Sequence, residues 1–238
     1  MKTTVKFAIC VLCPLLLASI ALAQQDYVGR YDLYTGYMYL DNPGLKLYEN
    51  GFHTQFGLNT KTWYTMGFDF SAGAGDTTLI PSMLKSSIQQ QIGAVLAPLK
   101  AAGYLPAGYE PAVPEHSRTQ TYATGPQLNY RHFKSITLFI HPDVGAIHET
   151  ATPITGSLDP ISKALVAQLS PSGTKEQWTW FYGFGGGMDF NITRNFGVKV
   201  HVDFVHDRLF SDLVMARNSV RLSIGPLFHM GKNIAAAK

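Results

Sequence analysis

The most constraining feature of the sequence is a run of alternating side chains between Trp178 and Phe228. Large apolar residues occupy every second position in three successive segments, and small or polar residues lie between them. A period of two is typical of β-strands whose two faces differ. The segments break at residues 193–195 and 206–218, which predicts three antiparallel strands. Their apolar residues are Trp178, Trp180, Tyr182, Phe184, Met188, Phe190 and Ile192, then Phe196, Val198, Val200, Val202 and Phe204, then Val220, Leu222, Ile224, Pro226 and Phe228.

Such strands fit two arrangements, and the N-terminus helps to choose between them. In a soluble barrel the apolar face turns inward, whereas in a membrane barrel it faces lipid and the polar face lines the lumen. Residues 1–23 have the features of a cleaved secretory signal, with a basic start, an apolar stretch from Phe7 to Leu17 and an Ala-Leu-Ala cleavage motif. Because that stretch is shorter than the ~20 residues of a spanning helix, we expect export and a location in the bacterial outer membrane.

The composition of the predicted mature chain, which begins at Gln24, restricts its partners. Cys10 and Cys13 both lie within the signal, so the mature chain has no cysteine. It must be held together without disulfides, which a closed, fully hydrogen-bonded barrel achieves. Without Lys2 and Lys6, 17 basic side chains oppose 16 acidic ones. This balance argues against nucleic acid as a partner, because phosphate binding needs a clustered positive excess.

The same alternation continues through the rest of the chain. Five further strand candidates lie at residues 27–40, 51–58, 63–72, 119–130 and 136–148. Short turns alternate with longer connections, as in barrels with periplasmic turns and extracellular loops. We therefore expect an all-β fold, an eight-stranded antiparallel up-and-down transmembrane β-barrel. The expected barrel domain covers residues 24–230, and a short C-terminal tail covers residues 231–238.

Two long connections, at residues 73–117 and 149–177, are the candidate binding regions. Between Pro81 and Ala102 the first has apolar residues at helical spacing, and Gly103 follows as a stop signal. This predicts an amphipathic helix in the second outer loop, acting either as a lid or membrane contact or as a helix packed on the barrel rim. Because loops on a rigid scaffold commonly carry function, both connections are candidates for contact with an extracellular ligand or surface partner.

The polar faces of the strands carry charges that we expect to form a network in the lumen. Centring the last two hairpins on their connecting segments places Asp189 opposite Lys199 and Asp203 opposite Arg221. An unpaired charge in so narrow an interior is costly, which favours pairing. The predicted lumenal residues are Asp69, Asp189, Lys199, His201, Asp203 and Arg221. The predicted lipid-facing residues are Phe68, Phe70, Trp180, Tyr182, Phe184, Val198, Val200, Val202, Phe204, Leu222, Ile224 and Phe228.

The sequence predicts no catalytic, cofactor or metal site. A histidine and a serine come near each other in two predicted outer loops, as His148 with Ser170 and His206 with Ser211, but no orienting carboxylate accompanies either pair. The histidines are scattered and lack the i, i+4 spacing of a helical metal site. The glycines at 185–187 lie within a strand instead of opening a helix, unlike a phosphate-binding loop.

Several short motifs occur in an order that can be compared with known families. They are Gly125-Pro126-Gln127, then Phe139, His141 and Gly145, then Gly185-Gly186-Gly187-Met188-Asp189, then Asp203, then Arg221-Leu222-Ser223-Ile224-Gly225. Together they resemble the small bacterial outer-membrane β-barrels, the OmpA-like or porin-family outer-membrane proteins. The resemblance implies an eight-stranded barrel placed in outer-membrane lipid by the barrel-insertion machinery. Such barrels often end on an aromatic residue, whereas here ten residues follow Phe228.

Two functions remain open from the sequence. A structural or surface-interaction barrel would use its long extracellular loops, and a narrow porin-like channel would pass small solutes through the lumen. The first is favoured, because eight strands enclose an interior just wide enough for side chains. A lipid A-modifying enzyme and a soluble ligand-binding barrel are weaker alternatives.

Overall fold

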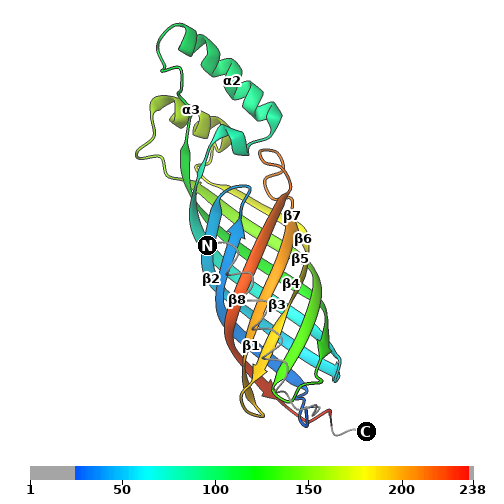
Figure 1. The fold of residues 1–238 in the computed structure, drawn as a ribbon. Helices are drawn as coiled ribbons and strands as arrows, with labels where there is room; N and C mark the ends of the chain where they lie inside the picture. The colour runs from blue at the N-terminus through cyan, green and yellow to red at the C-terminus, as the bar shows by residue number, and fades with distance from the viewer. Residues whose placement is uncertain (1–24, 236–238) are drawn as a thin grey trace, which may run out of the picture.

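The computed structural model describes residues 25–235 and shows one closed barrel (Figure 1). The predicted signal at 1–23 and the last three residues of the predicted tail lie outside the described residues. Each strand pairs antiparallel with its neighbours in sequence, and β1 closes the barrel against β8. The predicted eight-stranded up-and-down topology is confirmed. The strands are β1 (Tyr31–Asn42), β2 (Leu47–Lys61), β3 (Tyr64–Leu79), β4 (Val113–Tyr130), β5 (Ile136–Pro153), β6 (Lys175–Asn191), β7 (Phe196–Asp207) and β8 (Arg217–Met230).

The outer surface of the barrel is apolar. Phe68 is 50% exposed and Trp180 is 69% exposed, and both point away from a buried polar interior. A soluble monomer rarely exposes an apolar surface of this extent, whereas lipid would cover it. The described helices include none that is long and apolar enough to cross a membrane. Of the predicted lipid-facing residues, Phe68, Trp180, Tyr182, Phe184, Phe204, Leu222, Ile224 and Phe228 are exposed, and Phe70, Val198, Val200 and Val202 are half-buried against outward neighbours.

The two ends of the barrel differ in the length of their connections. At one end lie turns at residues 62–63, 131–135 and 192–195. At the other end lie four connections, which we call L1 (residues 43–46), L2 (80–112), L3 (154–174) and L4 (208–216). By analogy with outer-membrane barrels, the short turns face the periplasm and L1 to L4 face the outside.

Several predicted limits of strands and loops are wrong. The first strand begins at Tyr31 instead of Tyr27, and the second, predicted at residues 51–58, extends from Leu47 to Lys61. The loops predicted at 73–117 and 149–177 are shorter, because β3, β4, β5 and β6 continue beyond the lipid-facing belt. Above the belt the outward residues become polar, as at His116 and Arg118, so the apolar alternation ends although the hydrogen-bonded ladder does not.

L2, L3 and L4 fold together over the mouth of the barrel into a cap. The predicted helix is present as α2 (Ser86–Ala101), preceded by a separate 3-10 turn, η1 (Pro81–Met83). Ile92 and Leu96 of α2 are buried in an apolar cluster that extends from the cap into the barrel mouth. The apolar stripe of α2 is therefore used in packing.

A second helix in the cap, α3 (Pro160–Leu169), lies in L3 and was not predicted (Figure 1). Asp159 caps it by accepting hydrogen bonds from the backbone N–H groups of Ile161 and Ser162, at 2.9 and 3.1 Å. The Tyr109 hydroxyl of L2 also donates to Asp159, at 2.7 Å. The backbone N–H of Lys85 donates to the carbonyl of Leu213 at 2.8 Å, which joins L2 to L4. The cap is thus a connected structure.

Candidate functional site

The centre of the barrel contains a polar network around Arg221 of β8. The Arg221 side chain is 0% exposed, and its Nη2 lies 2.7 Å from the Asp203 carboxylate on β7. Its Nη1 donates to the hydroxyls of Ser71 and Thr121 across the barrel, at 3.1 Å each. His201 Nε2 lies 2.7 Å from the other oxygen of Asp203. Side chains from β3, β4, β7 and β8 therefore meet in one cross-section of the lumen.

Two further histidines, His53 and His141, complete this central network, and the sequence did not indicate them. His53 Nε2 and His141 Nε2 lie 3.0 and 3.4 Å from the two oxygens of Asp69. The rings of His53 and His201 stack with their centroids 5.4 Å apart. The interpretation of the histidines as scattered is therefore wrong for these three, because barrel closure brings distant strands face to face.

His53, His201 and Asp203 also offer three potential metal-ligand atoms within 4.8 Å of one another. In this arrangement each of them already contacts another polar group of the network. His53 contacts Asp69, and Asp203 is paired with Arg221. The contacts of these three residues with the network therefore account for their arrangement without a bound metal ion.

A second polar layer lies nearer the short turns and is organised by Lys199. Its Nζ is 3.5 Å from Asp189 and donates to the side-chain carbonyls of Gln55 and Gln127, at 2.8 and 3.3 Å. The hairpin register pairs Asp189 with Lys199 and Asp203 with Arg221, as predicted. The two layers together contain all the predicted lumenal residues, each of them buried: Asp69, Asp189, Lys199, His201, Asp203 and Arg221.

Between the central network and the mouth, the interior becomes apolar. Buried side chains from five strands and from L4 fill this level, and part of it belongs to the cluster that continues into the cap. These residues lie at the inward-facing positions of their strands, and the sequence pattern predicted polar side chains at those positions. The members of the layer are Met38, Leu47, Ile147, Phe181, Val205 and Leu209.

A third charged group adjoins this apolar layer at the barrel mouth, and we call it the rim cluster. Arg217 Nη2 is 2.6 Å from Glu149, and Arg217 Nε is 3.0 Å from Asp207. Glu49 accepts hydrogen bonds from the hydroxyls of Ser117 and Thr119, at 2.8 Å each. The sequence missed this group because four of its members, Glu115, Glu149, Asp207 and Arg217, lie in segments expected to be connections. The members of the rim cluster are Glu49, Glu115, Glu149, Asp207 and Arg217.

Glu115 differs from the other members of the rim cluster. It is only 6% exposed, yet no hydrogen bond or ion pair joins its carboxylate to any of residues 25–235. It lies on β4 beyond the lipid-facing belt, beside the outward His116. Burial and, to a smaller extent, the nearby Glu149 carboxylate raise the pKa of Glu115 to about 7, and Arg217 opposes both effects.

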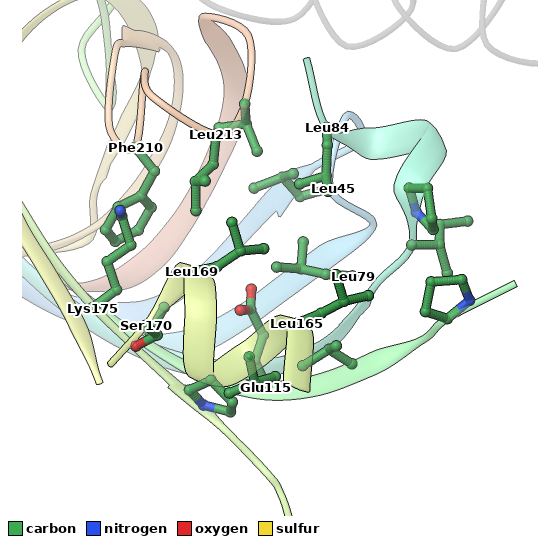
Figure 2. A pocket seen from close by; sticks show the side chains of 18 of the residues that line it. Leu45, Leu79, Leu84, Glu115, Leu165, Leu169, Ser170, Lys175, Phe210 and Leu213 are labelled. Atoms are coloured by element: carbon green, nitrogen blue, oxygen red, sulfur yellow. The ribbon is translucent and has the colours of Figure 1, made fainter. Parts of the chain in front are cut away.

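Glu115 lines a cavity of about 90 Å³ between the cap and the barrel mouth. Figure 2 shows its carboxylate pointing into a space surrounded by leucine side chains from β3 and α3. Ser170, at the end of α3, also lines the cavity, and its hydroxyl is buried without a hydrogen-bond partner among the described residues. The apolar lining includes Leu45, Leu79, Leu84, Leu165, Leu169 and Leu213.

The histidine–serine pairs considered from the sequence are not assembled as catalytic pairs. The ring of His148 stacks on Trp178 on the outer face, with centroids 4.5 Å apart, whereas Ser170 is buried inside the cap. His206 Nδ1 lies 2.8 Å from the side-chain oxygen of Asn218. Within residues 25–235, neither histidine is hydrogen-bonded to its candidate serine.

A closed eight-stranded barrel with an apolar exterior and aromatic residues at both edges of its belt is a membrane β-barrel. No protein-family model matches the sequence, and no curated protein matches it. Solved structures of outer-membrane barrels do match.

Neisserial surface protein A is 7% identical, and the match covers 84% of this chain and 96% of that chain with a TM-score of 0.50. The outer membrane protein OprG from Pseudomonas aeruginosa is 11% identical, with 88% and 99% covered and a TM-score of 0.50. The attachment invasion locus protein Ail of Yersinia pestis is 10% identical, with 84% and 98% covered and a TM-score of 0.47. The matches to Neisserial surface protein A and OprG show that the chain has the fold of the small bacterial outer-membrane barrels, and its apolar belt agrees with that location.

Proposed function

We propose that this protein is a non-conducting outer-membrane barrel that presents its cap to a partner at the cell surface. The observation that carries the proposal is the closed interior, in which Arg221 is fully buried and paired across the lumen. A solute would have to separate this network and also cross the apolar layer above it. Separating buried ion pairs is costly, so the barrel interior is better suited to rigidity than to transport.

The cap supports the second half of the proposal. Its three loops share one apolar cluster, and hydrogen bonds join L2 to L3 and L4. It also presents large side chains outward, with Tyr104 79% exposed and Val95 half exposed on the outer side of L2. Exposed aromatic residues on a folded loop are typical of surfaces that bind macromolecules.

Removal of L2 tests the surface role. Leu79 and Val113 are opposite each other in the β3–β4 ladder, so an Asn-Gly turn in place of residues 80–112 should close the hairpin directly. We expect cells that display the full chain to adhere to wells coated with collagen or mucin, and the shortened chain to lose that adhesion. A Tyr104→Ser, Val95→Ser variant keeps the cap core and should lose most of the same adhesion.

Heat-modifiable migration on detergent gels checks that each variant forms a barrel. Adhesion that persists without L2 would contradict the proposal, and a shortened chain that fails to fold would make L2 a structural element. Planar-bilayer recordings of the purified full chain should show no reproducible conductance steps, and such steps would contradict the closed lumen. We also propose that the protein has no catalytic activity, so lipid A mass spectra should not change when it is expressed.

A further inference from the structure

We propose that the cavity beneath the cap is a binding site for a small apolar amine, whose ammonium group is held by Glu115 and whose hydrocarbon part contacts the leucines of β3 and α3. This inference goes beyond the surface role proposed above and does not depend on it. The site lies at the mouth of the barrel beneath the cap, and its ligand would enter from outside the cell.

The charge of the rim cluster indicates a missing cation. Four carboxylates share a single guanidinium, and Arg217 is already in contact with Glu149 and Asp207. Two hydroxyls donate to one oxygen of Glu49, and its other oxygen is buried without a partner. No hydrogen bond or ion pair of the described residues reaches Glu115. A buried carboxylate without a partner is strongly unfavourable, and a positively charged ligand would supply the partner.

The lining of the cavity indicates that the cation is organic. Apart from Glu115, its walls are mostly leucine and other apolar side chains (Figure 2). Ca²⁺ takes roughly six to eight oxygen ligands, whereas this cavity offers Glu115, the Ser170 hydroxyl and a Glu149 that is already paired. A volume of about 90 Å³ suits a short alkyl chain or a single small ring. The ammonium has the Glu115 carboxylate as its acceptor.

The ionisation of Glu115 should make binding dependent on pH. With the pKa of Glu115 raised to about 7 by burial, the free site is mostly neutral at pH 6 and mostly ionised at pH 8. An alkylamine remains protonated over this range, so its affinity should rise with pH. The charged groups facing Glu115 are Glu149 of β5, Arg217 of β8 and Lys175 of β6, and Lys175 is itself bound to Asp212 at 2.5 Å.

Methyl NMR of the full barrel in lipid nanodiscs can test the site directly. With labelled leucine methyl groups, n-hexylamine should shift the resonances of Leu79, Leu165 and Leu169 in a saturable way at pH 8. The matched neutral probe is 1-hexanol, which has the same chain without the charge. We expect hexylamine to bind at least about tenfold more tightly than hexanol, and this preference to shrink severalfold at pH 6.

Three variants assign the effect to the cavity and its carboxylate. Glu115→Gln should weaken hexylamine binding by about tenfold or more and leave hexanol unchanged. Glu176→Gln makes the same chemical change at an exposed position on β6 and should have no effect. Leu165→Phe fills the cavity and should weaken both probes while Glu115 remains in place.

Equal binding of hexylamine and hexanol, or an unchanged hexylamine affinity in Glu115→Gln, would overturn the proposal. So would the absence of saturable shifts at the cavity methyl groups. If calcium ions produce the same shifts, the cavity is a site for inorganic cations instead of amines. None of these results bears on adhesion, so failure of this inference is distinguishable from failure of the surface role.

Discussion

The central network and the rim cluster both place charges inside the barrel, but they differ in how those charges are matched. Around Arg221, both Asp69 and Asp203 lie within contact distance of a guanidinium or an imidazole. At the rim, Arg217 is the single cation for four carboxylates, and Glu115 has no partner among the described residues. The central carboxylates Asp69, Asp143 and Asp203 each lie within 3.9 Å of a guanidinium or an imidazole, although neither oxygen of Asp143 accepts a hydrogen bond. Glu115 at the rim has no such contact among the described residues.

The difference follows the position of each region along the barrel axis. The central network lies at lipid depth, where no mobile ion or water can compensate a buried charge, so the chain has to provide both partners. The rim cluster lies above the lipid belt, beside a cavity bounded by movable loops. An incomplete cluster is tolerable there because a proton or a ligand can complete it.

The largest effect should come from removing the central guanidinium. Arg221→Leu leaves Asp203 buried without its main partner and should lower the free energy of unfolding by about 3–5 kcal/mol. Urea unfolding of the barrel in lipid vesicles measures this change. The double variant with Asp203→Asn should recover part of the loss. A cost below about 1 kcal/mol for the single variant would show that the pairing at the centre is not needed.

Introducing a charged residue on the lipid-facing surface should have the next largest effect. Val200 lies in the middle of β7 on the outer face, and Val200→Arg should lower the free energy of unfolding by about 2–4 kcal/mol. Val220→Arg, nearer the outer edge of the belt, is the matched control and should cost about 0–1 kcal/mol. Equal costs at both positions in the same vesicle assay would contradict the placement of the belt.

At the rim, removing a charge should stabilise the structure instead. The pKa of Glu115 is raised from 4.5 to about 7, so the folded cap binds this proton more tightly than the open cap. The stability of the closed cap should therefore fall as the pH rises from about 4.5 to about 7, by up to about 3 kcal/mol, and stay level above that. Glu115→Gln should remove the part of the fall that Glu115 causes, whereas Glu49, whose pKa burial also raises to about 7, remains in the variant.

Hydrogen exchange of the L2 and L3 backbone at pH 5 and pH 8 measures the effect. Glu115→Gln should protect the cap more than the unmodified chain at pH 8 and equally at pH 5. Glu176→Gln should behave as the unmodified chain at both values. Faster exchange in Glu115→Gln at pH 8 would mean that Glu115 has a cationic partner in the free protein.

The smallest effect concerns the cap alone. Asp159→Ala removes the N-cap of α3 and should lower the local stability of L3 by about 1 kcal/mol, with no change in barrel unfolding. The hydrogen bond from Ser162 is the largest influence that holds the pKa of Asp159 at about 2, below its usual 3.8. The contribution of Asp159 to the stability of L3 is thus present above pH 3.8 and is lost as the pH falls towards 2. Limited proteolysis of L3 at neutral pH would detect the weakened cap.

The sequence predicted those features that depend on a single hairpin. Alternation identified the strands, and the positions of the last two connections predicted the registers of Asp189 with Lys199 and of Asp203 with Arg221. Contacts across the lumen were not predictable in this way. The meeting of His53 with His201 depends on closure and stagger of the whole barrel, which no local pattern specifies.

The rim cluster and α3 were missed for different reasons. Above the lipid belt both faces of β4 are polar, so Glu115 and Ser117 lack the alternation that marks a strand. The short α3 is flanked by segments rich in proline, serine and glycine, and such a composition predicts a loop when only the local sequence is considered. Its Asp159-Pro160 start is a recognisable helix signal that could have indicated it.

The residues around Val28 and Asn233 show how the two described ends of the chain meet. The side-chain oxygen of Asn233 accepts from the Val28 backbone, and the Ile234 N–H donates to the Val28 carbonyl, both at 2.9 Å. These two hydrogen bonds lie at the end of the barrel that carries the short turns, next to the paired strands β1 and β8. A reporter domain fused after this point should therefore report from the periplasm, whereas an epitope inserted in L3 should be stained on intact cells. The same proximity makes the barrel a suitable scaffold for circular permutation, with new ends opened in L3.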